Sequence, residues 1–450
     1  MGTIYRKSAF TISAAKAKNG TESCFVSRNA KATQSCQLNI EFADSNSFSS
    51  HVFPFARWRP IGPLYNRAWV FQEQALSART LAYSAENLHW TCVALTASES
   101  NPVGWGKHKL NVIEDFQRSI KIIEGRASHG PINREDREKL YTIWYDIVAS
   151  YSIRKATRFT DRLPALSGLA SEMTKVIGDK YVAGLWRDDL GRALLWSCPG
   201  VKGQRAKDQS GYIAPSWSWA SVTGTMISLE AGKNLPAYSE WDDRDFNILW
   251  VGVVYKGPNK FGQLSHGLIK IEGLIKEALT SRPRRRMGSE RARGDQAEKG
   301  NILVNAEGEG SNKKQGVTEL EMEDIEVDVW EDIEEDIGDI EADNEITGED
   351  KITLFARESG FELFDRESGF EVEGYSYDEI DCEHSSVWCL AIKERVQNHG
   401  DYEDYEVWSK RCLALVPTGV AEGQFRRVGL AFISDPQWFE DVFERIIDIV

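Results

Sequence analysis

Cysteine is scarce in this sequence, with seven among 450 residues, and no two of them form a Cys-x-x-Cys pair. So low a density excludes the disulfide scaffold of a small secreted protein. A group of Cys and His residues near the C-terminal end fits no standard zinc-ligand spacing. This group is Cys382, His384, Cys389 and Cys412. We therefore predict reduced thiols and no metal site.

Long apolar runs are absent as well. The longest strongly apolar run is Leu249–Tyr255, whereas a membrane-spanning helix needs about 20 such residues. Ser, Thr and Lys interrupt the apolar residues at the N-terminal end, which does not resemble a signal peptide. We expect no membrane span and a cytoplasmic protein.

Several motifs that bind phosphates or metals are also missing. The sequence has no Gly-x-x-x-x-Gly-Lys loop, no Gly-x-Gly-x-x-Gly turn after a strand and no His-Glu-x-x-His. His89 and Cys92 are three positions apart on a predicted strand, so their side chains should face opposite sides of a sheet. This spacing argues against a Cys–His nucleophile pair.

Acidic residues outnumber basic residues, and one segment accounts for the excess. The net charge is −15, but Glu319–Asp350 contains 17 acidic residues and no Lys or Arg. Without that segment 54 basic residues face 52 acidic ones, so the charge says little about the partner of the folded part. The acidic total argues weakly against nucleic acid. Arg284-Arg285-Arg286 is a candidate nuclear-localisation or RNA-contact patch, but neutralisation by the nearby acidic run is the interpretation that we favour.

Hydrophobic periodicity predicts both helices and strands in the first half. Ile4–Ala14 alternates loosely, which indicates a strand, and Arg67–Leu76 suits a short helix. Arg79–Ser84 and Leu88–Val93 have the pattern of two strands joined by a tight turn. Together they predict a compact helix and hairpin.

The middle of the chain has the pattern of helices. Apolar residues recur at helical spacing over residues 140–151 and again over 163–177, where Gly178 is a suitable helix stop. Trp186 and Trp196 lie in a stretch that we also expect to be helical. The run Trp217-Ser218-Trp219 could stack on a ring-shaped ligand, but indoles of this kind more often fill a core.

From about residue 245 the pattern changes to strands without intervening helices. This predicts an antiparallel sandwich or barrel. A charged, low-complexity insertion at 280–350 interrupts the strands. Such a composition offers too little apolar surface to offset the entropy of ordering, so we expect this insertion to be disordered.

The segment around Trp69 contains the most candidates for chemistry. Glu73 lies on the predicted helix beside aromatic residues, an environment in which burial can raise the pKa of a carboxyl and favour general-acid catalysis. A structural role is the alternative, with Glu73 paired to Arg67 or Arg79. Gln72 could likewise cap backbone groups of the hairpin.

Several ordered motifs resemble the fungal heterokaryon-incompatibility (HET) domain proteins. The string from Arg67 to Arg79, followed by Trp90-Thr91-Cys92, is similar to the family signature. Further matching stretches are Met1–Tyr5, Asp161–Ala170, Gly184-Leu185-Trp186, Leu194-Leu195-Trp196 and Ala214–Ser221. The family-motif residues are Arg67, Trp69, Gln72, Glu73, Ser77, Arg79, Trp90 and Cys92.

The resemblance also shows departures. Ala68 stands where the family has Gly, and Val70-Phe71 replace Thr-Leu. Two upstream elements of the family are missing, so the chain resembles a truncated member. We therefore expect an α+β protein with four parts. They are residues 1–96, the C-terminal half of a TIR-like α/β HET domain; 97–225, a helical HET-associated region; 226–279 and 351–450, a β-rich part; and 280–350, the disordered insertion.

The resemblance implies a function in non-self recognition and programmed cell death, exerted through protein partners and self-assembly. A distant similarity to TIR domains implies NAD or nucleotide glycohydrolysis as an alternative, with NAD as substrate, no cofactor, and Glu73 as the catalytic candidate. A third reading is an inactive truncated chain that serves as a binding or scaffold protein.

Overall fold

The chain folds as an α+β protein. The computed structural model describes residues 2–25, 36–41, 47–52, 60–104, 111–127, 130–198, 204–205, 212–229, 246–281, 360–365, 371–377, 386–398, 406–433 and 437–450. All of these belong to one unit, Met1–Pro283 with Phe355–Val450, and the second unit is Arg284–Leu354. Apart from residues 280 and 281, the predicted insertion lies outside the described residues, as do Arg284-Arg285-Arg286, Cys382 and His384.

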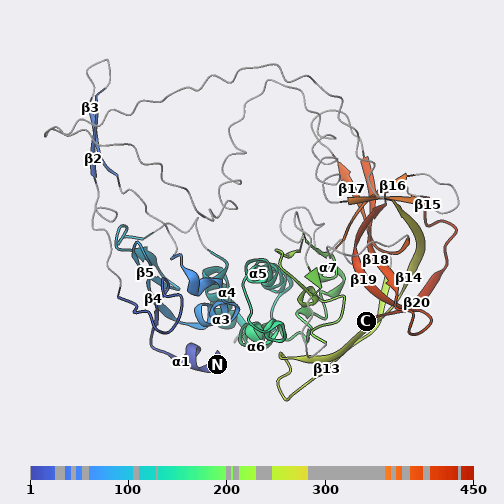
Figure 1. The fold of residues 1–450 in the computed structure, drawn as a ribbon, viewed down its shortest axis with the longest axis horizontal. Helices are drawn as coiled ribbons and strands as arrows, with labels where there is room; N and C mark the ends of the chain where they lie inside the picture. The colour runs from blue at the N-terminus through green and yellow to red at the C-terminus, as the bar shows by residue number, and fades with distance from the viewer. Residues whose placement is uncertain are drawn as a thin grey trace, which may run out of the picture. The chain divides into compact units, whose positions relative to one another are not determined.

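A small sheet lies in the N-terminal part (Figure 1). Its strands are β1 (Thr11–Ser13), β4 (Arg79–Tyr83), β5 (Leu88–Cys92) and β6 (Thr96–Ser98), in the order β1-β4-β5-β6. β1 is parallel to β4, and the other pairs are antiparallel. The predicted hairpin is therefore confirmed as β4 and β5.

The predicted strand at Ile4–Ala14 is only partly right. Its second half contains β1, but its first half belongs to helix α1 (Gly2–Lys7). A Cβ on Gly2 would lie 3.1 Å from Leu76 Cδ1 and 3.3 Å from the Gly168 Cα. Tertiary packing of α1 against α3 and α6 thus decides a conformation that the weak local pattern does not.

The two faces of this sheet differ in the polarity of their side chains. Polar side chains predominate in two rows across one face, which contacts the helices through Thr11 to Ser77 (Oγ1–Oγ 2.8 Å) and Thr96 to Glu114 (Oγ1–Oε1 2.5 Å). The rows are Thr11, Thr80, Thr91 and Thr96, and Ser13, Ala82, His89 and Ser98. The opposite face is more apolar, with Ile12, Leu81, Trp90 and Ala97 in register.

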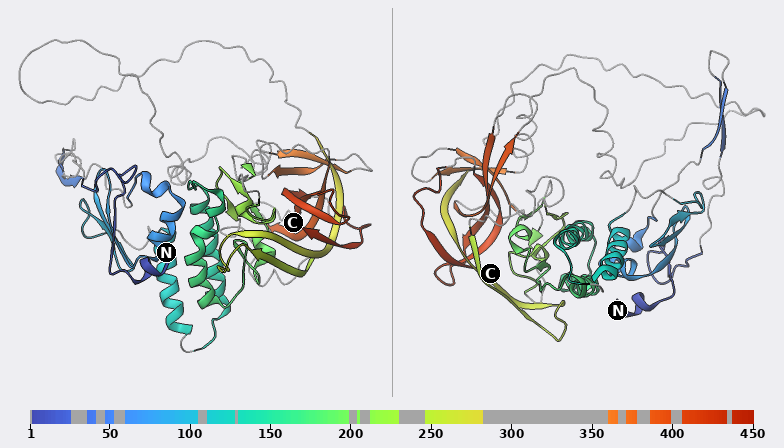
Figure 2. Two further views of the ribbon diagram at one scale, coloured as in Figure 1. Left: turned by 60° about the horizontal axis from the view of Figure 1, so that its bottom comes forward. Right: turned by 180° about the vertical axis from the view of Figure 1, so that it is seen from behind.

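Four helices follow in the chain and contact one another: α3 (Ala68–Leu76), α4 (Val112–Ala127), α5 (Arg134–Ser152) and α6 (Ser167–Ile177). Figure 2 shows α4 and α5 side by side. The predictions of α3, α5 and α6 are confirmed, and Gly178 ends α6 with a left-handed φ of 76°. Helix α4 was not predicted, although Phe116, Ile120 and Ile123 recur at helical spacing and are buried.

The predicted helical stretch around Trp186 and Trp196 is wrong. The two tryptophans lie on short strands, β8 (Leu185–Trp186) and β9 (Trp196–Ser197), with only α7 (Leu190–Ala193) between them. The remaining short elements are β2 (Cys36–Glu41), β3 (Ser47–Val52), η1 (Pro63–Asn66), η3 (Phe159–Asp161), η4 (Pro164–Leu166), β7 (Tyr181–Val182), β10 (Gln204–Arg205), η5 (Trp219–Ser221), β11 (Val222–Thr223) and β12 (Ser228–Leu229).

Five tryptophans are fully buried among the described residues: Trp144, Trp186, Trp196, Trp217 and Trp219. A buried indole fills space and usually finds an acceptor for its N–H, as three of these five do. The Gly184 carbonyl accepts from Trp144 Nε1 (2.9 Å) and Trp219 Nε1 (3.0 Å), and Trp196 Nε1 donates to the Trp217 carbonyl (2.9 Å). Core packing is therefore the role of the Trp217-Ser218-Trp219 run.

The C-terminal part is a sheet of eight described strands. They are β13 (Phe246–Tyr255), β14 (Leu264–Ser281), β15 (Gly360–Asp365), β16 (Glu371–Tyr377), β17 (Ser386–Asn398), β18 (Glu406–Pro417), β19 (Gln424–Ile433) and β20 (Glu444–Ile449). β14 pairs with both β17 and β20, and β17-β18-β19 leads back to β20, so the sheet closes on itself. The predicted strands are confirmed and are antiparallel, except that β19 and β20 are parallel.

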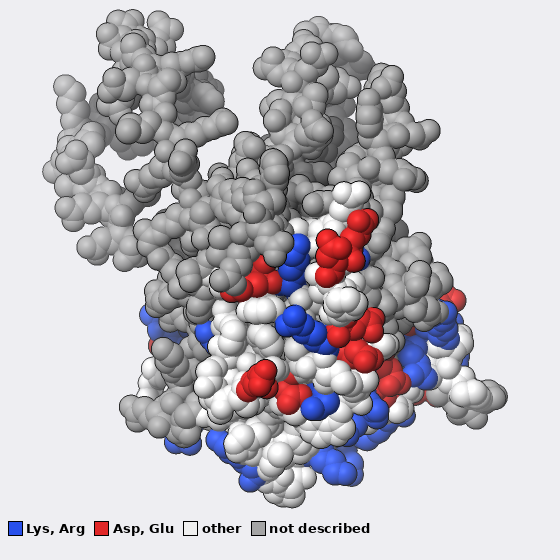
Figure 3. Space-filling model, turned by 90° about the vertical axis from the view of Figure 1, so that its right-hand side faces the viewer, with Lys and Arg blue, Asp and Glu red and all other residues white. Residues whose placement is uncertain are grey.

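Charge on the β-rich side is mixed in sign. Figure 3 shows Lys and Arg interspersed with Asp and Glu over this face, with no large region of one sign. Within the described part of the chain, none of the helices is both long enough and apolar enough to span a membrane.

Arg427 joins the sheet to the tryptophan core. Its side chain is fully buried, its guanidinium lies 3.7 Å from the centre of the Trp196 ring, and it donates to the Leu194 and Trp196 carbonyls. The neighbouring backbone adds a second link, because Arg427 N donates to Ser216 Oγ (3.0 Å) and Ser216 N donates to the Val450 carbonyl (3.0 Å). Cation–π stacking and charge-assisted hydrogen bonds are both strong when water is excluded.

We expect Arg427→Met to lower the free energy of unfolding by about 3 kcal/mol, because it leaves two buried carbonyls without donors and uncovers the Trp196 ring. Arg426→Met is the matched control, since Arg426 is only partly buried and its loss should cost less than about 1 kcal/mol. Urea unfolding measures both. Equal losses would show that the position of Arg427 has no special role.

Candidate functional site

Helix α3 contains three of the eight predicted family-motif residues, and Arg67 and Ser77 flank its two ends. The helix begins after Arg67, where Ala68 N donates to the Lys155 carbonyl (2.9 Å). It ends at Ser77, whose Oγ donates to the Glu73 carbonyl (2.6 Å). Both ends of α3 are thus fixed by hydrogen bonds that offset the unsatisfied backbone groups of a helix terminus.

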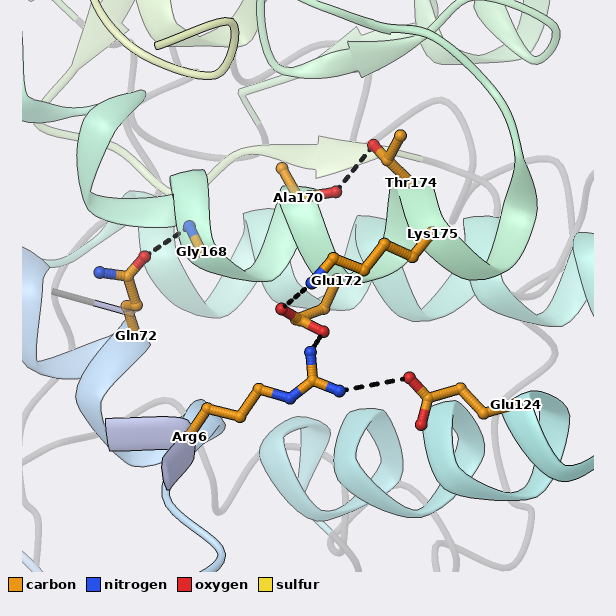
Figure 4. A network of polar contacts seen from close by, with 8 residues as sticks. All are labelled: Arg6, Gln72, Glu124, Gly168, Ala170, Glu172, Thr174 and Lys175. Atoms are coloured by element: carbon orange, nitrogen blue, oxygen red, sulfur yellow. Dashed lines mark hydrogen bonds and ion pairs between the residues drawn. The ribbon is translucent and has the colours of Figure 1, made fainter. Parts of the chain in front are cut away.

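Two motif side chains connect α3 to the stretch that begins at Asp161. Trp69 Nε1 donates to Asp161 Oδ2 (3.1 Å), and the Oε1 of the buried Gln72 accepts from Gly168 N (2.6 Å). Figure 4 shows the Gln72 contact at the start of α6. The structure therefore brings two motifs together that are some 90 positions apart in the sequence.

Gly168 is required at this contact. A Cβ at this position would lie 2.4 Å from Gln72 Oε1 and 2.7 Å from Leu76 Cδ1. Contacts that short force neighbouring atoms to move, and Gln72 is held in a buried environment. The sequence shows Gly168 inside a matching stretch, but only the tertiary structure reveals why a side chain does not fit there.

An exposed ion network holds α1 beside this contact. Arg6 pairs with Glu172 on α6 and with Glu124 on α4 (3.5 Å), and Lys175 also pairs with Glu172 (2.7 Å; Figure 4). Arg6 is 43% exposed, so such pairs contribute little free energy. They orient α1 against α4 and α6.

Glu73 has a partner that the sequence did not suggest. The Tyr5 hydroxyl on α1 hydrogen-bonds to Glu73, and burial together with this carboxylate raises the pKa of Tyr5 to about 12. Among the ion pairs of the described residues, none joins Glu73 to Arg67 or Arg79, and Arg79 instead donates to the Ala9 carbonyl (3.2 Å). The proposed pairing of Glu73 with these arginines is therefore wrong.

The hairpin residues of the motif lie apart from the α3 residues. Arg79 and Cys92 are direct neighbours across β4 and β5, and Trp90 lies on the same face as Cys92. This face is opposite to the one on which Thr11 and Thr96 contact the helical layer. The motif thus divides between a helix and the far face of a sheet, and it does not form one pocket.

His89, which the sequence analysis considered only as a possible partner of Cys92, is a buried polar group in the sheet. It is 2% exposed, and its Nδ1 has no hydrogen-bond partner within the described residues. Burial lowers the pKa of His89 to about 4, against an opposing effect of Glu99. His89 is therefore neutral at pH 7, and alternation along β5 places Cys92 on the other face, as predicted.

A cavity among the described residues lies away from the motif. It has a volume of about 230 Å³ and is lined by the α4–α5 connection, with the Arg126–Asp136 ion pair (2.8 Å) on its wall. It includes no motif residue. No cluster of His, Cys, Asp or Glu in the described ranges could hold a metal ion.

Comparison with known proteins supports the family resemblance. The family model for the heterokaryon incompatibility protein (HET) matches residues 1–73, a segment that contains α1, β1 and most of α3. The match confirms a HET-domain segment in this chain and ends at Glu73. No curated protein and no solved structure matches the chain.

We expect Gly168→Ala to lower the free energy of unfolding by about 2 kcal/mol, because overpacking a fixed contact strains its neighbours. Gly125→Ala is the matched control: Gly125 lies in helix α4, and a Cβ there meets nothing within 4 Å. That change should stabilise the protein by about 0.5 kcal/mol or more. Thermal and urea unfolding compare the two variants, and a neutral Gly168→Ala would contradict the assigned role of the glycine.

Proposed function

We propose that this chain acts in heterokaryon incompatibility, as a cytoplasmic protein of fungal non-self recognition and programmed cell death that works through protein assembly. The observation that carries this proposal is the HET match over residues 1–73. The departures from the family signature at Ala68, Val70 and Phe71 fall within α3, where Ala68 and Phe71 are buried. They are therefore apolar residues within a packed helix.

The geometry of the motif supports assembly over small-molecule binding. Trp69, Gln72 and Ser77 direct their polar atoms to other parts of the same chain. Side chains used in this way build a rigid platform and leave few groups to bind a ligand. A platform of this kind suits recognition by a protein partner, and the TIR-like signalling that we propose for this domain also works by assembly.

Expression of the chain in a filamentous fungal host should clearly reduce colony survival, as expected of a cell-death protein. The Gly125→Ala variant should lower colony survival as much as the unaltered chain does, because it retains the Gln72–Gly168 contact. The Gly168→Ala variant should lower colony survival by a smaller factor, because less of the chain is folded. Colony counts after induced expression measure this, and full survival with the unaltered folded chain would refute the proposal.

A second proposal is NAD glycohydrolysis, by analogy with TIR domains. The observation that favours it is the Glu73 carboxylate held by the Tyr5 hydroxyl beside the half-buried Trp69. A positioned carboxylate next to an aromatic ring could contact the ribose of NAD during cleavage of the glycosidic bond. NAD would be the substrate and no cofactor would be needed.

If this second proposal holds, Glu73→Gln should lower NAD consumption by about 100-fold, since the loss of a positioned acid or base typically costs at least that much. Glu124→Gln, which removes a carboxylate from the surface of α4, is the control and should retain activity. Chromatography of NAD and nicotinamide with purified full-length chain provides the readout. Equal rates for both variants would remove Glu73 from the mechanism, and an inactive unaltered chain would remove the activity itself.

A further inference from the structure

Strand β13 is a long open edge of the C-terminal sheet. It pairs with β14 along one side only. From Asn247 to Tyr255, its other side has no backbone hydrogen-bond partner within the described residues. A row of unpaired N–H and C=O groups selects an extended strand as its partner, because only a strand matches their spacing.

The composition of β13 makes this edge unusual. Natural edge strands are commonly protected by charged residues, by proline or by being short. The ten residues of β13 include neither a charged residue nor a proline. The edge strands β1 and β6 of the N-terminal sheet have only three residues each, so β13 offers a much longer open edge than either of them.

Exposed apolar side chains extend along the same strand. Leu249, Trp250 and Val254 are 47%, 53% and 57% exposed. The Trp250 ring lies across Gly252, where a Cβ would come within 2.3 Å of the indole. Gly252 therefore allows the indole to lie along the strand, and this apolar surface adjoins the open backbone edge.

Charge near the two ends of β13 favours a second copy of this chain, in antiparallel orientation, as the partner. Glu272, on the neighbouring strand β14, lies beside Asn247 at the beginning of β13, and Asn247 Nδ2 donates to its carboxylate (3.4 Å). Lys256 and Lys260 are exposed just beyond the other end. Antiparallel alignment brings the acidic end of each copy toward the basic end of the other, whereas parallel alignment would place like charges together.

We propose that β13 pairs edge to edge with β13 of a second copy, so that the two C-terminal sheets form one continuous antiparallel sheet across a two-fold axis. Such an interface is isologous and closes after two copies, giving a dimer and not a fibre. The centre of β13 carries no charge, so pairing two copies adds no like-charge repulsion there. The biological role of the dimer rests on the assembly function proposed above. The formation of the dimer does not depend on that function.

Analytical ultracentrifugation of the purified full-length chain, from about 1 to 100 µM, tests the proposal. We expect a concentration-dependent dimer. The double variant Trp250→Lys with Val254→Lys should raise the dissociation constant at least tenfold, because it places like charges in the paired centre. Ile446→Lys is the matched control: Ile446 is 55% exposed on β20, on the side of β14 away from β13, and its dimer should be unchanged.

Lys256→Glu tests the orientation. It should weaken an antiparallel dimer several-fold at low salt and less at high salt, because screening shortens the range of the attraction. Circular dichroism melting curves establish that each variant remains folded. A folded chain that stays monomeric to about 100 µM, or a double variant that dimerises as tightly as the unaltered chain, would overturn the proposal. Colony survival is read separately, so a failed dimer test and a failed cell-death function remain distinguishable.

Discussion

The burial of five indoles constrains the rest of the described fold, because each must be surrounded by apolar atoms and most need an acceptor for the N–H. Gly184 is central to this arrangement. Its carbonyl accepts from Trp144 on α5 and from Trp219 in η5, and its φ of 96° would strain any residue with a side chain. A Cβ there would also lie 2.6 Å from Trp219 Nε1. One backbone position thus connects the helical layer to the Trp217-Ser218-Trp219 run.

The same core extends into the C-terminal sheet. Trp196 donates to the Trp217 carbonyl while its ring receives the guanidinium of Arg427 from β19. Ser216 contacts both Arg427 and Val450 through backbone and hydroxyl groups. The β-rich part is therefore attached through the residues that also complete the tryptophan core, and the two parts depend on each other for stability.

The family motif also serves this internal architecture. Trp69 and Gln72 bind to Asp161 and Gly168, and Glu73 binds Tyr5 from α1. The polar atoms of the motif are used inside the chain, which leaves recognition to surfaces such as the open edge of β13. This division between an internal platform and an external edge is compatible with a protein that acts by assembly.

Much of the secondary structure could be predicted from local pattern. The helices α5 and α6 and the β4–β5 hairpin have strong periodicity and suitable end signals, because each buries one regular face. The prediction failed where local pattern is weak and packing decides. Residues 4–7 form a helix because α1 is held by α3 and α6, and Trp186 and Trp196 lie on two-residue strands because the core fixes their rings.

The candidate site shows the same limit. The sequence identified Trp69, Gln72 and Glu73 by their resemblance to a family signature, but it suggested the wrong partners for Glu73. The partners of Trp69, Gln72 and Glu73 lie 92, 96 and 68 positions away in the chain, respectively. A pattern of neighbouring residues cannot predict contacts over such separations.

The sequence by itself determined the helical and strand periods, the acidic segment and the HET resemblance, because these depend on neighbouring residues. Only the tertiary structure decided which polar groups face each other, why Gly168 and Gly184 are required, and which strand edge is left open. These features arise when distant segments compete for the same space and the same hydrogen-bonding groups.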